Sequence, residues 1–116
     1  MNIVPAEVGG REARIDGHII GLHRNYGVLP AGAKIEIGVR PEFLDVAPPA
    51  SGLLSATIER IDDLGRIRFA RVRVGDAKFA ARVPPGFSIP DNVAGLVFDP
   101  THVHVYADSR LVEGVA

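Results

Sequence analysis

The sequence predicts an all-β fold, a small barrel of short antiparallel strands with an additional small β subdomain. The chain has 116 residues, enough for one core and too few for two ordinary domains. Its 13 glycines and 9 prolines are spread along the whole length, so they divide it into short segments and leave no room for a long helix. Within many of these segments apolar and polar residues alternate, which is the period of a half-buried strand.

A hairpin is expected near the N-terminus. Residues 13–15 and 18–22 are apolar runs that flank Asp16-Gly17. A type I′ turn needs positive φ at both central residues, and Asp-Gly is among the dipeptides that supply it. Residues 23–33 follow as a loop, broken by glycine and proline.

The next strand, over residues 34–39, ends abruptly at Arg40-Pro41. Proline fixes its own φ and has no N–H to donate, so the hydrogen-bond ladder must stop or reach an edge there. The following Glu42-Phe43-Leu44 is expected to form one short turn that returns Phe43 or Leu44 to the sheet. The apolar face of this strand consists of Ile35, Ile37 and Val39.

Residues 45–52, with Pro48-Pro49, are expected to be a linker across the surface. Changes in the parity of the apolar residues near 58–61 and 69–70 predict a β-bulge in each of the two strands that follow. Residues 95–98 are apolar without alternation, which predicts that both faces of their strand are covered. The strands expected after the linker are 53–63, 66–74, 77–83, 93–98 and 102–106, with a short edge at 111–112.

Eight or nine short, mostly antiparallel strands with bulged corners fit a barrel of the oligonucleotide/oligosaccharide-binding (OB) type. A helix over residues 53–64 is disfavoured, because Thr57, Ile58 and Ile61 are β-branched and Ser55 is a poor helix former.

Composition argues against several classes of function. The net charge is −1, from 13 basic and 14 acidic residues without a block of one sign, so a nucleic-acid-binding surface is not expected. The chain has no cysteine, which excludes thiol catalysis and disulfides. No signal peptide is expected from the first residues, and no apolar run approaches the roughly 20 residues that span a bilayer.

Two histidines are the best candidates for metal ligands. His102 and His104 would share one face of a strand, where Asp99 or Asp108 could add an oxygen. The alternative is that His104 is a packed barrel residue.

Arginines on neighbouring strands also allow two interpretations. They could form a face that binds an anion or nucleic acid, or they could be a solvated face balanced by Glu59, Asp62, Asp63 and Asp76. Asp62 and Asp63 point to opposite faces of a strand, and no serine lies in a nucleophile motif, so no catalytic residue is expected. The arginines concerned are Arg66, Arg68, Arg71, Arg73 and Arg82.

Three motifs, taken in order, resemble the C-terminal regulatory (TOBE, transport-associated OB) domain of ATP-binding subunits from bacterial ABC importers for carbohydrates and glycerol-3-phosphate. Gly38-Val39-Arg40-Pro41-Glu42-Phe43-Leu44 resembles the family's "G-[IV]-R-P-E-x-[IL]" signature. Residues 58–65 are similar to its "V-E-x-L-G" corner, and residues 96–106 to its "P-x-x-[LC]-H-[LV]-F" ending. The "D-x-x-T-G" tail is matched only loosely, since Ser109-Arg110 replaces the usual residues.

The resemblance implies a domain division. Residues 1–12 would link to an ATPase domain absent from this chain, and residues 13–116 would be the regulatory domain. Asn2-Ile3-Val4-Pro5 is similar to the family's linker segment, so Met1 is either an internal family residue or a plain initiator. No phosphate-binding G-x-x-x-x-G-K-[ST] motif occurs, so no ATP or magnesium site and no hydrolysis are expected here.

The resemblance also implies partners and contact residues. The partners would be a second ATP-binding subunit, the membrane subunits of the importer through the parent chain, and a regulatory protein, with the parent at the cytoplasmic face of the inner membrane. Arg40 and Glu42 are expected either to contact a partner or to brace the corner, for example through Glu59. A freestanding module that binds an oxyanion or a sugar is the alternative function. The expected contact residues are Arg40, Pro41, Glu42, Asp63, Gly65 and His104.

Overall fold

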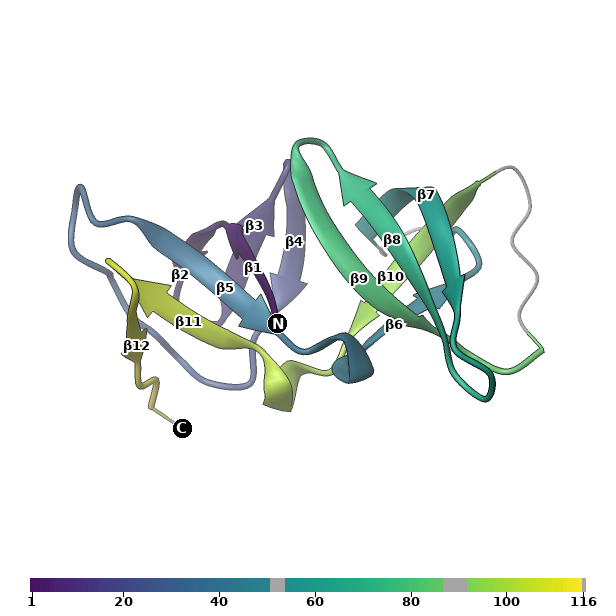
Figure 1. Ribbon diagram of the computed structural model, residues 1–116. Coiled ribbons are helices and arrows are strands. Elements are labelled where there is room, and N and C mark those ends of the chain that lie inside the picture. The colour runs from purple at the N-terminus through teal and green to yellow at the C-terminus, as the bar shows by residue number, and fades with distance from the viewer. Residues whose placement is uncertain (51–53, 87–91, 116) are drawn as a thin grey trace.

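A computed structural model describes residues 1–50, 54–86 and 92–115. Within these residues the regular structure consists of short strands and two single turns of 3-10 helix, and no helix is long and apolar enough to cross a membrane. Figure 1 shows two lobes side by side, a closed barrel and a pair of small sheets. The expected all-β, OB-like fold with an additional β subdomain is confirmed.

The barrel closes in the order β10-β6-β9-β8-β7. β7, β8 and β9 form an antiparallel meander. β10 pairs with both β7 and β6, and β6 closes the ring by pairing in parallel with β9. A closed ring has no free edge, so every strand is paired on both sides. The barrel strands are β6 (Leu44–Ala47), β7 (Leu54–Asp63), β8 (Arg68–Val74), β9 (Ala77–Val83) and β10 (Val93–Phe98).

One of the two expected bulges is present. The register of β7 against β8 shifts between Ile58 and Arg60, which confirms the bulge expected there. The second bulge was wrong: β8 pairs with β9 in unbroken register from Arg68 to Val74. Ala70, Val72 and Val74 keep one parity into the core, and Phe69 lies on the outer face with Arg71.

The other lobe contains a four-stranded sheet in the order β1-β5-β11-β12. Its central strand β5 confirms the strand expected before Arg40, and Ile37 and Val39 on it are completely buried. The short edge expected at 111–112 is also confirmed. The strands are β1 (Asn2–Pro5), β5 (Ile35–Val39), β11 (His104–Ala107) and β12 (Arg110–Val112).

A three-stranded sheet, β2-β3-β4, completes this lobe. Asp16 and Gly17 have φ of 50° and 79°, so the expected hairpin turn is confirmed. Residues 1–12, expected as a linker, contribute β1, β2 and the start of β3 to these sheets; whether an ATPase domain precedes them stays a prediction. The strands are β2 (Glu7–Gly9), β3 (Glu12–Ile15) and β4 (His18–Gly21).

Three local expectations need correction. The expectation of a surface linker at 45–52 was wrong for residues 45–47, which belong to β6. Leu44 and Val46 of this strand are buried in the barrel and alternate with Asp45 and Ala47. Residues 51 and 52 lie outside the described part of the chain. Val97 is 43% exposed, so β10 is not covered on both faces. His102 lies in a 3-10 turn, so the strand expected from residue 102 begins only at His104.

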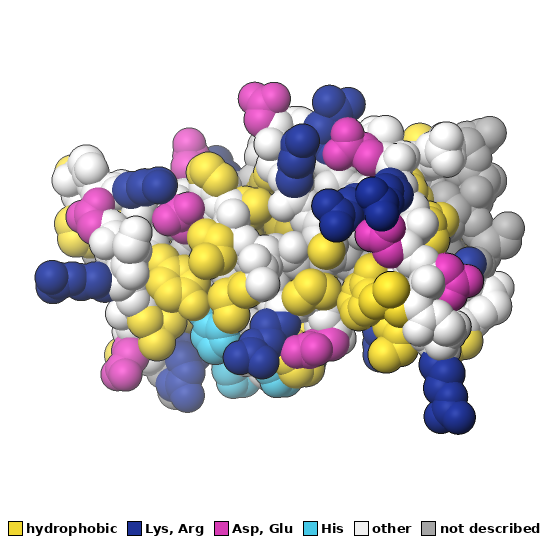
Figure 2. All heavy atoms as spheres, in the orientation of Figure 1, with side chains coloured by type: hydrophobic (Ala, Val, Ile, Leu, Met, Phe, Trp, Pro, Cys, Tyr) yellow, Lys and Arg dark blue, Asp and Glu magenta, His cyan; other side chains and the backbone are white. Residues whose placement is uncertain are grey.

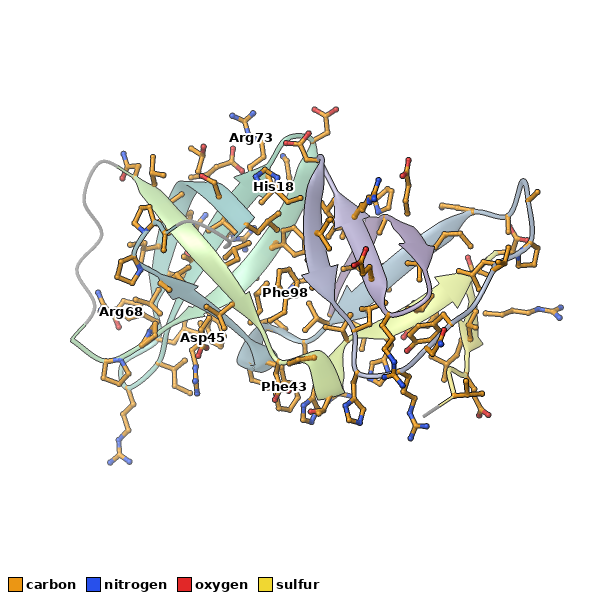
Figure 3. All side chains as sticks on the ribbon, turned by 180° about the vertical axis from the view of Figure 1, so that it is seen from behind. His18, Phe43, Asp45, Arg68, Arg73 and Phe98 are labelled. Atoms are coloured by element: carbon orange, nitrogen blue, oxygen red, sulfur yellow. The ribbon has the colours of Figure 1, made fainter. Side chains whose placement is uncertain are left out.

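Two 3-10 turns connect the lobes: η1 (Pro41–Phe43) leads from β5 into the barrel, and η2 (Pro100–His102) leads back from β10 to β11. The turns contact each other. The Asp99 amide donates to the Phe43 carbonyl over 3.0 Å, and the rings of Phe43 and His102 stack with centroids 3.6 Å apart. Figure 3 shows Phe43 at this junction, below Phe98.

Candidate functional site

The corner, residues 40–44, is rigid because its backbone hydrogen bonds are made internally. Arg40 has φ −73° and ψ 147°, the extended conformation that a residue before proline prefers. The Phe43 amide donates to the Arg40 carbonyl and the Leu44 amide to the Pro41 carbonyl. Leu44 is completely buried in the barrel, which confirms that this turn returns an apolar side chain to the sheet.

The charged side chains of the corner point outward. The Arg40 Nη1 atom lies 4.0 Å from Glu42 Oε1, and both side chains are more than half exposed. Among the described residues Glu42 is the carboxylate that Arg40 pairs with, so the brace to Glu59 does not form. An exposed pair of this kind contributes little to stability, which leaves both heads available to a partner.

Asp63 and Gly65 form the tip of the β7–β8 hairpin. The Asp63 Oδ1 atom accepts from the Gly65 amide over 2.9 Å. Gly65 has φ +87°, a conformation that side chains rarely adopt. The Leu64 amide donates to the Ile67 carbonyl and closes the turn. The local bonds hold the tip in one shape.

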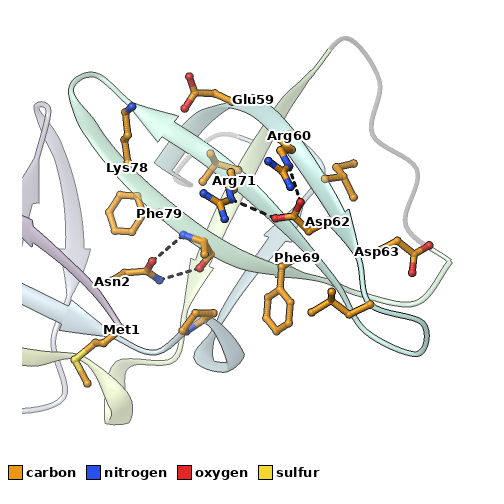
Figure 4. A pocket seen from close by; sticks show the side chains of 15 residues that line it. Met1, Asn2, Glu59, Arg60, Asp62, Asp63, Phe69, Arg71, Lys78 and Phe79 are labelled. Carbon is orange, nitrogen blue, oxygen red and sulfur yellow. Dashed lines mark hydrogen bonds and ion pairs between the residues drawn. The ribbon is translucent and has the colours of Figure 1, made fainter.

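A groove of about 1220 Å³ brings the corner and the hairpin tip together. Pro41 lines it from the corner, and Asp63 and Leu64 line it from the tip. In Figure 4, Phe69 lies on the hairpin side and Met1 and Asn2 on the sheet side. We call this surface, with Arg40, Glu42, Gly65 and Ile67 at its margin, the corner–hairpin face.

Asn2 anchors the sheet lobe to the barrel at the bottom of this groove. Its side-chain amide donates to the Ala80 carbonyl over 2.8 Å, and its Oδ1 atom accepts from the Ala80 amide over 2.7 Å (Figure 4). Asn2 is 8% exposed. The paired bonds to one residue of β9 fix the position of β1 against the barrel.

Asp62 holds two arginines across the groove wall. Its carboxylate accepts from Arg60 Nε over 2.6 Å and from Arg71 Nε over 3.2 Å (Figure 4). Partial desolvation raises the pKa of Asp62, but the hydrogen bonds from Arg71 and Arg60 outweigh it, so the net shift is downward. Asp62, Arg60 and Arg71 thus form a hydrogen-bonded row of charged side chains along this wall of the groove.

The lowered pKa of Asp62 sets the pH below which the hydrogen bonds to its carboxylate are lost. A carboxylate with a lowered folded pKa stabilises the fold above its unfolded pKa, and this contribution is lost as pH falls through the folded value. We therefore expect the Asp62 carboxyl to titrate below its ordinary 3.8 in an NMR pH titration. Substituting Arg71→Gln should raise the midpoint toward the ordinary value; an unchanged midpoint would contradict the role assigned to Arg71.

The rim of the groove is apolar and exposed. Leu64 is 70% exposed and Ile67 is 49% exposed, and Phe69 is half-buried. Ile61, 42% exposed, pairs with Ala70 and therefore lies on the opposite face of the hairpin from Phe69. Figure 2 shows hydrophobic side chains gathered on this face between charged ones. Sequence reasoning missed the cluster, although the apolar residues on both sides of the Asp63-Leu64-Gly65 turn were a signal. Contiguous apolar surface of this kind marks interaction sites.

The two histidines considered as candidate metal ligands lie in different elements. The His102 Nδ1 atom lies 3.0 Å from Asp99 Oδ2, inside η2, whereas His104 is exposed on β11. The alternative of a packed His104 was therefore wrong. The pKa of Asp99 is lowered, and the hydrogen bond from the Thr101 hydroxyl is the largest cause. The described residues contain no group of three or more metal-ligating side chains.

The arginines on the barrel are partly paired. Arg82 makes two hydrogen bonds to Asp45, over 2.9 and 3.0 Å, which hold it as a fork on β6. This pairing raises the pKa of Arg82 through the hydrogen bond and the charge of Asp45. With Asp62 holding Arg71, the observed pairs fit the balanced, solvated face rather than the anion-binding one.

Six residues were expected to make contacts, and two of them meet at the groove. Pro41 and Asp63 line the groove, and Arg40, Glu42 and Gly65 flank these two in the chain. His104 lies apart, at a separate pocket beside the C-terminal strand. The roles of all six stay predictions.

Comparison with known proteins agrees with these features. The profile of the TOBE domain family matches residues 37–106, from the centre of β5 through the barrel to β11. The chain is 28% identical over 113 residues to the sulfoquinovosyl glycerol transport ATP-binding protein SmoE of Agrobacterium fabrum, covering 91% of this chain and 31% of that protein. It is 28% identical over 82 residues to the trehalose/maltose import ATP-binding protein MalK of Thermococcus litoralis, covering 65% of this chain and 22% of that protein.

The chain therefore spans about a third or less of the length of the curated relatives it matches. The matched segment contains the corner, all five barrel strands and η2, which together hold the motifs that predicted the resemblance. That prediction is confirmed, and the chain belongs to the TOBE domain family.

Proposed function

We propose that this chain is a regulatory accessory domain of an ATP-binding subunit in a carbohydrate or glycerol-derivative importer. Family membership supports the accessory role, and the names of the two relatives support the substrate class. In this proposal the domain binds no nucleotide and catalyses no step. ATP hydrolysis belongs to another part of the parent, at the cytoplasmic face of the membrane.

The domain acts through the corner–hairpin face, and the observation that carries this proposal is the exposed apolar rim beside the rigid corner. The first occupant is the same face of a second copy, related by a two-fold axis, since paired subunits bury one patch on both partners. A regulatory protein that competes for this face would separate the two copies and thereby influence transport.

The apolar rim supplies area, and the charged corner supplies orientation. Burying the Leu64 and Ile67 side chains removes apolar surface from water, which stabilises the contact by about 25 cal/mol for each Å² buried. The opposite charges of Arg40 and Glu42 lie 4.0 Å apart, so a two-fold axis that passes beside this pair would place each Arg40 near the partner's Glu42. A contact this small is expected to be weak in the isolated domain.

The substitution Arg40→Ala tests the role of the corner. We expect the dissociation constant for self-association to rise about threefold to tenfold, because a rim charge pair guides and orients the contact. The free energy of unfolding should stay within about 0.5 kcal/mol of the parent value, since the pair with Glu42 is exposed. Sedimentation equilibrium measures the first quantity and chemical denaturation the second.

Arg110→Ala provides the matched control, because Arg110 is an exposed arginine on β12, outside the corner–hairpin face. It should change neither quantity. If Arg40→Ala lowers the melting temperature by several degrees and leaves self-association unchanged, Arg40 only braces the corner and the proposed contact is wrong.

A further inference from the structure

A second pocket, of about 400 Å³, lies in the sheet lobe away from the groove. Three separate segments line it: the loop after β4, the start of β11 with η2, and β12 with the two residues that follow it. Its volume is in the range of small-molecule sites. Neither the resemblance nor the proposed function uses it, apart from His104 at its wall.

The loop that forms one wall, residues 22–34, is long but held in place. A loop of about a dozen residues without regular structure is uncommon in a small domain and is usually functional. Asn25 and Val115 exchange two backbone hydrogen bonds, of 2.8 and 2.9 Å, and the Tyr26 amide donates to the Gly10 carbonyl. Arg11 Nη1 donates to the His23 carbonyl over 3.0 Å. These bonds present His23, Arg24 and Tyr26 to the pocket.

The C-terminal segment packs closely against this loop. A Cβ atom added at Gly114 would lie 2.7 Å from the Cβ of Arg24 and 3.1 Å from the ring of Tyr26. The contact leaves no room for a side chain at Gly114. The pocket is therefore assembled from fixed parts.

The polar groups at this pocket are mostly donors without an acidic partner. Arg24, His23 and His104 form no ion pair with a carboxylate in the described part of the chain, whereas Arg60, Arg71 and Arg82 each do. Burial raises the pKa of Tyr26, against the opposing charge of Arg24, so its hydroxyl stays protonated as a further donor. Glu113 is the one acidic side chain in the lining.

The remaining wall is apolar. Val103 is buried there, and Leu111 and Val112 contribute from β12. A ligand matched to this pocket carries several acceptor oxygens at one end, for the guanidinium and imidazoles, and an organic group at the other. Arginine favours phosphate and carboxylate, and a phosphate monoester offers enough oxygens for three or four donors.

We propose that this pocket binds a small organic phosphate monoester, with Arg24, His23 and His104 around the phosphate and Val103 and Leu111 against the organic group. The site is distinct from the corner–hairpin face, and it gives the domain a way to respond to a phosphorylated metabolite. The inference does not depend on the proposed subunit contact, since binding to a single copy suffices.

Titration calorimetry with phenyl phosphate tests this site, with phenol and inorganic phosphate as matched ligands. We expect phenyl phosphate to bind to one site more tightly than inorganic phosphate, and phenol not to bind. Substituting Arg24→Gln should weaken binding by at least about tenfold, as loss of a charge-assisted hydrogen bond does. Substituting Glu113→Gln should strengthen binding, because it removes the one negative charge.

Arg73→Gln and His18→Gln are the matched controls, since both residues lie outside the pocket (Figure 3). Neither should change the affinity. The proposal is overturned if no phenyl phosphate binds at millimolar concentration, if Arg24→Gln and Arg73→Gln weaken binding equally, or if inorganic phosphate binds as tightly as the ester. Amide shifts of Ile37 and Val39, which are completely buried outside the pocket, confirm on each variant that the fold is intact.

Discussion

Replacing Leu44 with alanine is expected to lower the free energy of unfolding by about 3 kcal/mol, the middle of the range for a fully buried leucine. Leu44 is completely buried where the corner enters the barrel, and it pairs with Phe98 on β10. The substitution removes buried methyl groups and leaves a cavity that the closed ring cannot collapse into. Thermal denaturation should show a melting temperature lower by about 10–20 °C.

Leu64→Ala is the control for this substitution. Leu64 is the same residue type but 70% exposed at the hairpin tip. Its loss should change the free energy of unfolding by less than about 0.5 kcal/mol. Equal losses for the two variants would mean that the corner does not anchor in the barrel core.

The second large effect is expected at Asn2. Substituting Asn2→Asp keeps an acceptor for the Ala80 amide but removes the donor to the Ala80 carbonyl, and it places a charged oxygen against that carbonyl. Because the site is largely shielded from water, we expect a loss of about 2 kcal/mol in the free energy of unfolding. Chemical denaturation measures it.

Asn25→Asp separates this effect from a general cost of added charge. The Asn25 Oδ1 atom accepts from the Gly27 amide over 2.9 Å, and aspartate keeps that bond. This variant should be close to neutral. If both variants lose the same stability, the double hydrogen bond to Ala80 does not join the lobes as described.

Local alternation predicted the strands whose pattern runs long enough to be read. β9 buries Phe79, Ala81 and Val83, and β7 buries alternate residues from Leu54 to Ile58, so the side chains of these strands alone indicate a face. β6 was missed because it has four residues and precedes Pro48-Pro49. Its inclusion depends on long-range pairing, with β10 on one side and with β9 on the other.

β1 and β2 were missed for a related reason. β1 spans only Asn2–Pro5, and its pairing with β5 is set by a partner more than thirty residues away. The expected bulge in β8 is absent because Ala70, Val72 and Val74 keep one parity into the core, whereas Phe69 lies on the outer face and forms part of the groove. A small buried residue carries too weak a signal to fix the face of a strand.

For the candidate site, the sequence identified the residues but not their arrangement. Pro41 and Asp63-Leu64 belong to separate motifs, and only the closed barrel brings them to one groove. The pairing of Arg82 with Asp45 and of Asn2 with Ala80 crosses the fold in the same way. Contacts between distant segments depend on topology, which no local pattern contains.

The most direct test of the proposed role is a series of amide NMR spectra of this chain from micromolar to millimolar concentration. We expect concentration-dependent shifts confined to the corner–hairpin face, at residues 40–43 and 63–69, with the remaining amides unchanged. Such a pattern would place the self-contact where the apolar rim and the charged corner meet. Spectra that do not change with concentration, or shifts centred on β12 instead, would contradict the account.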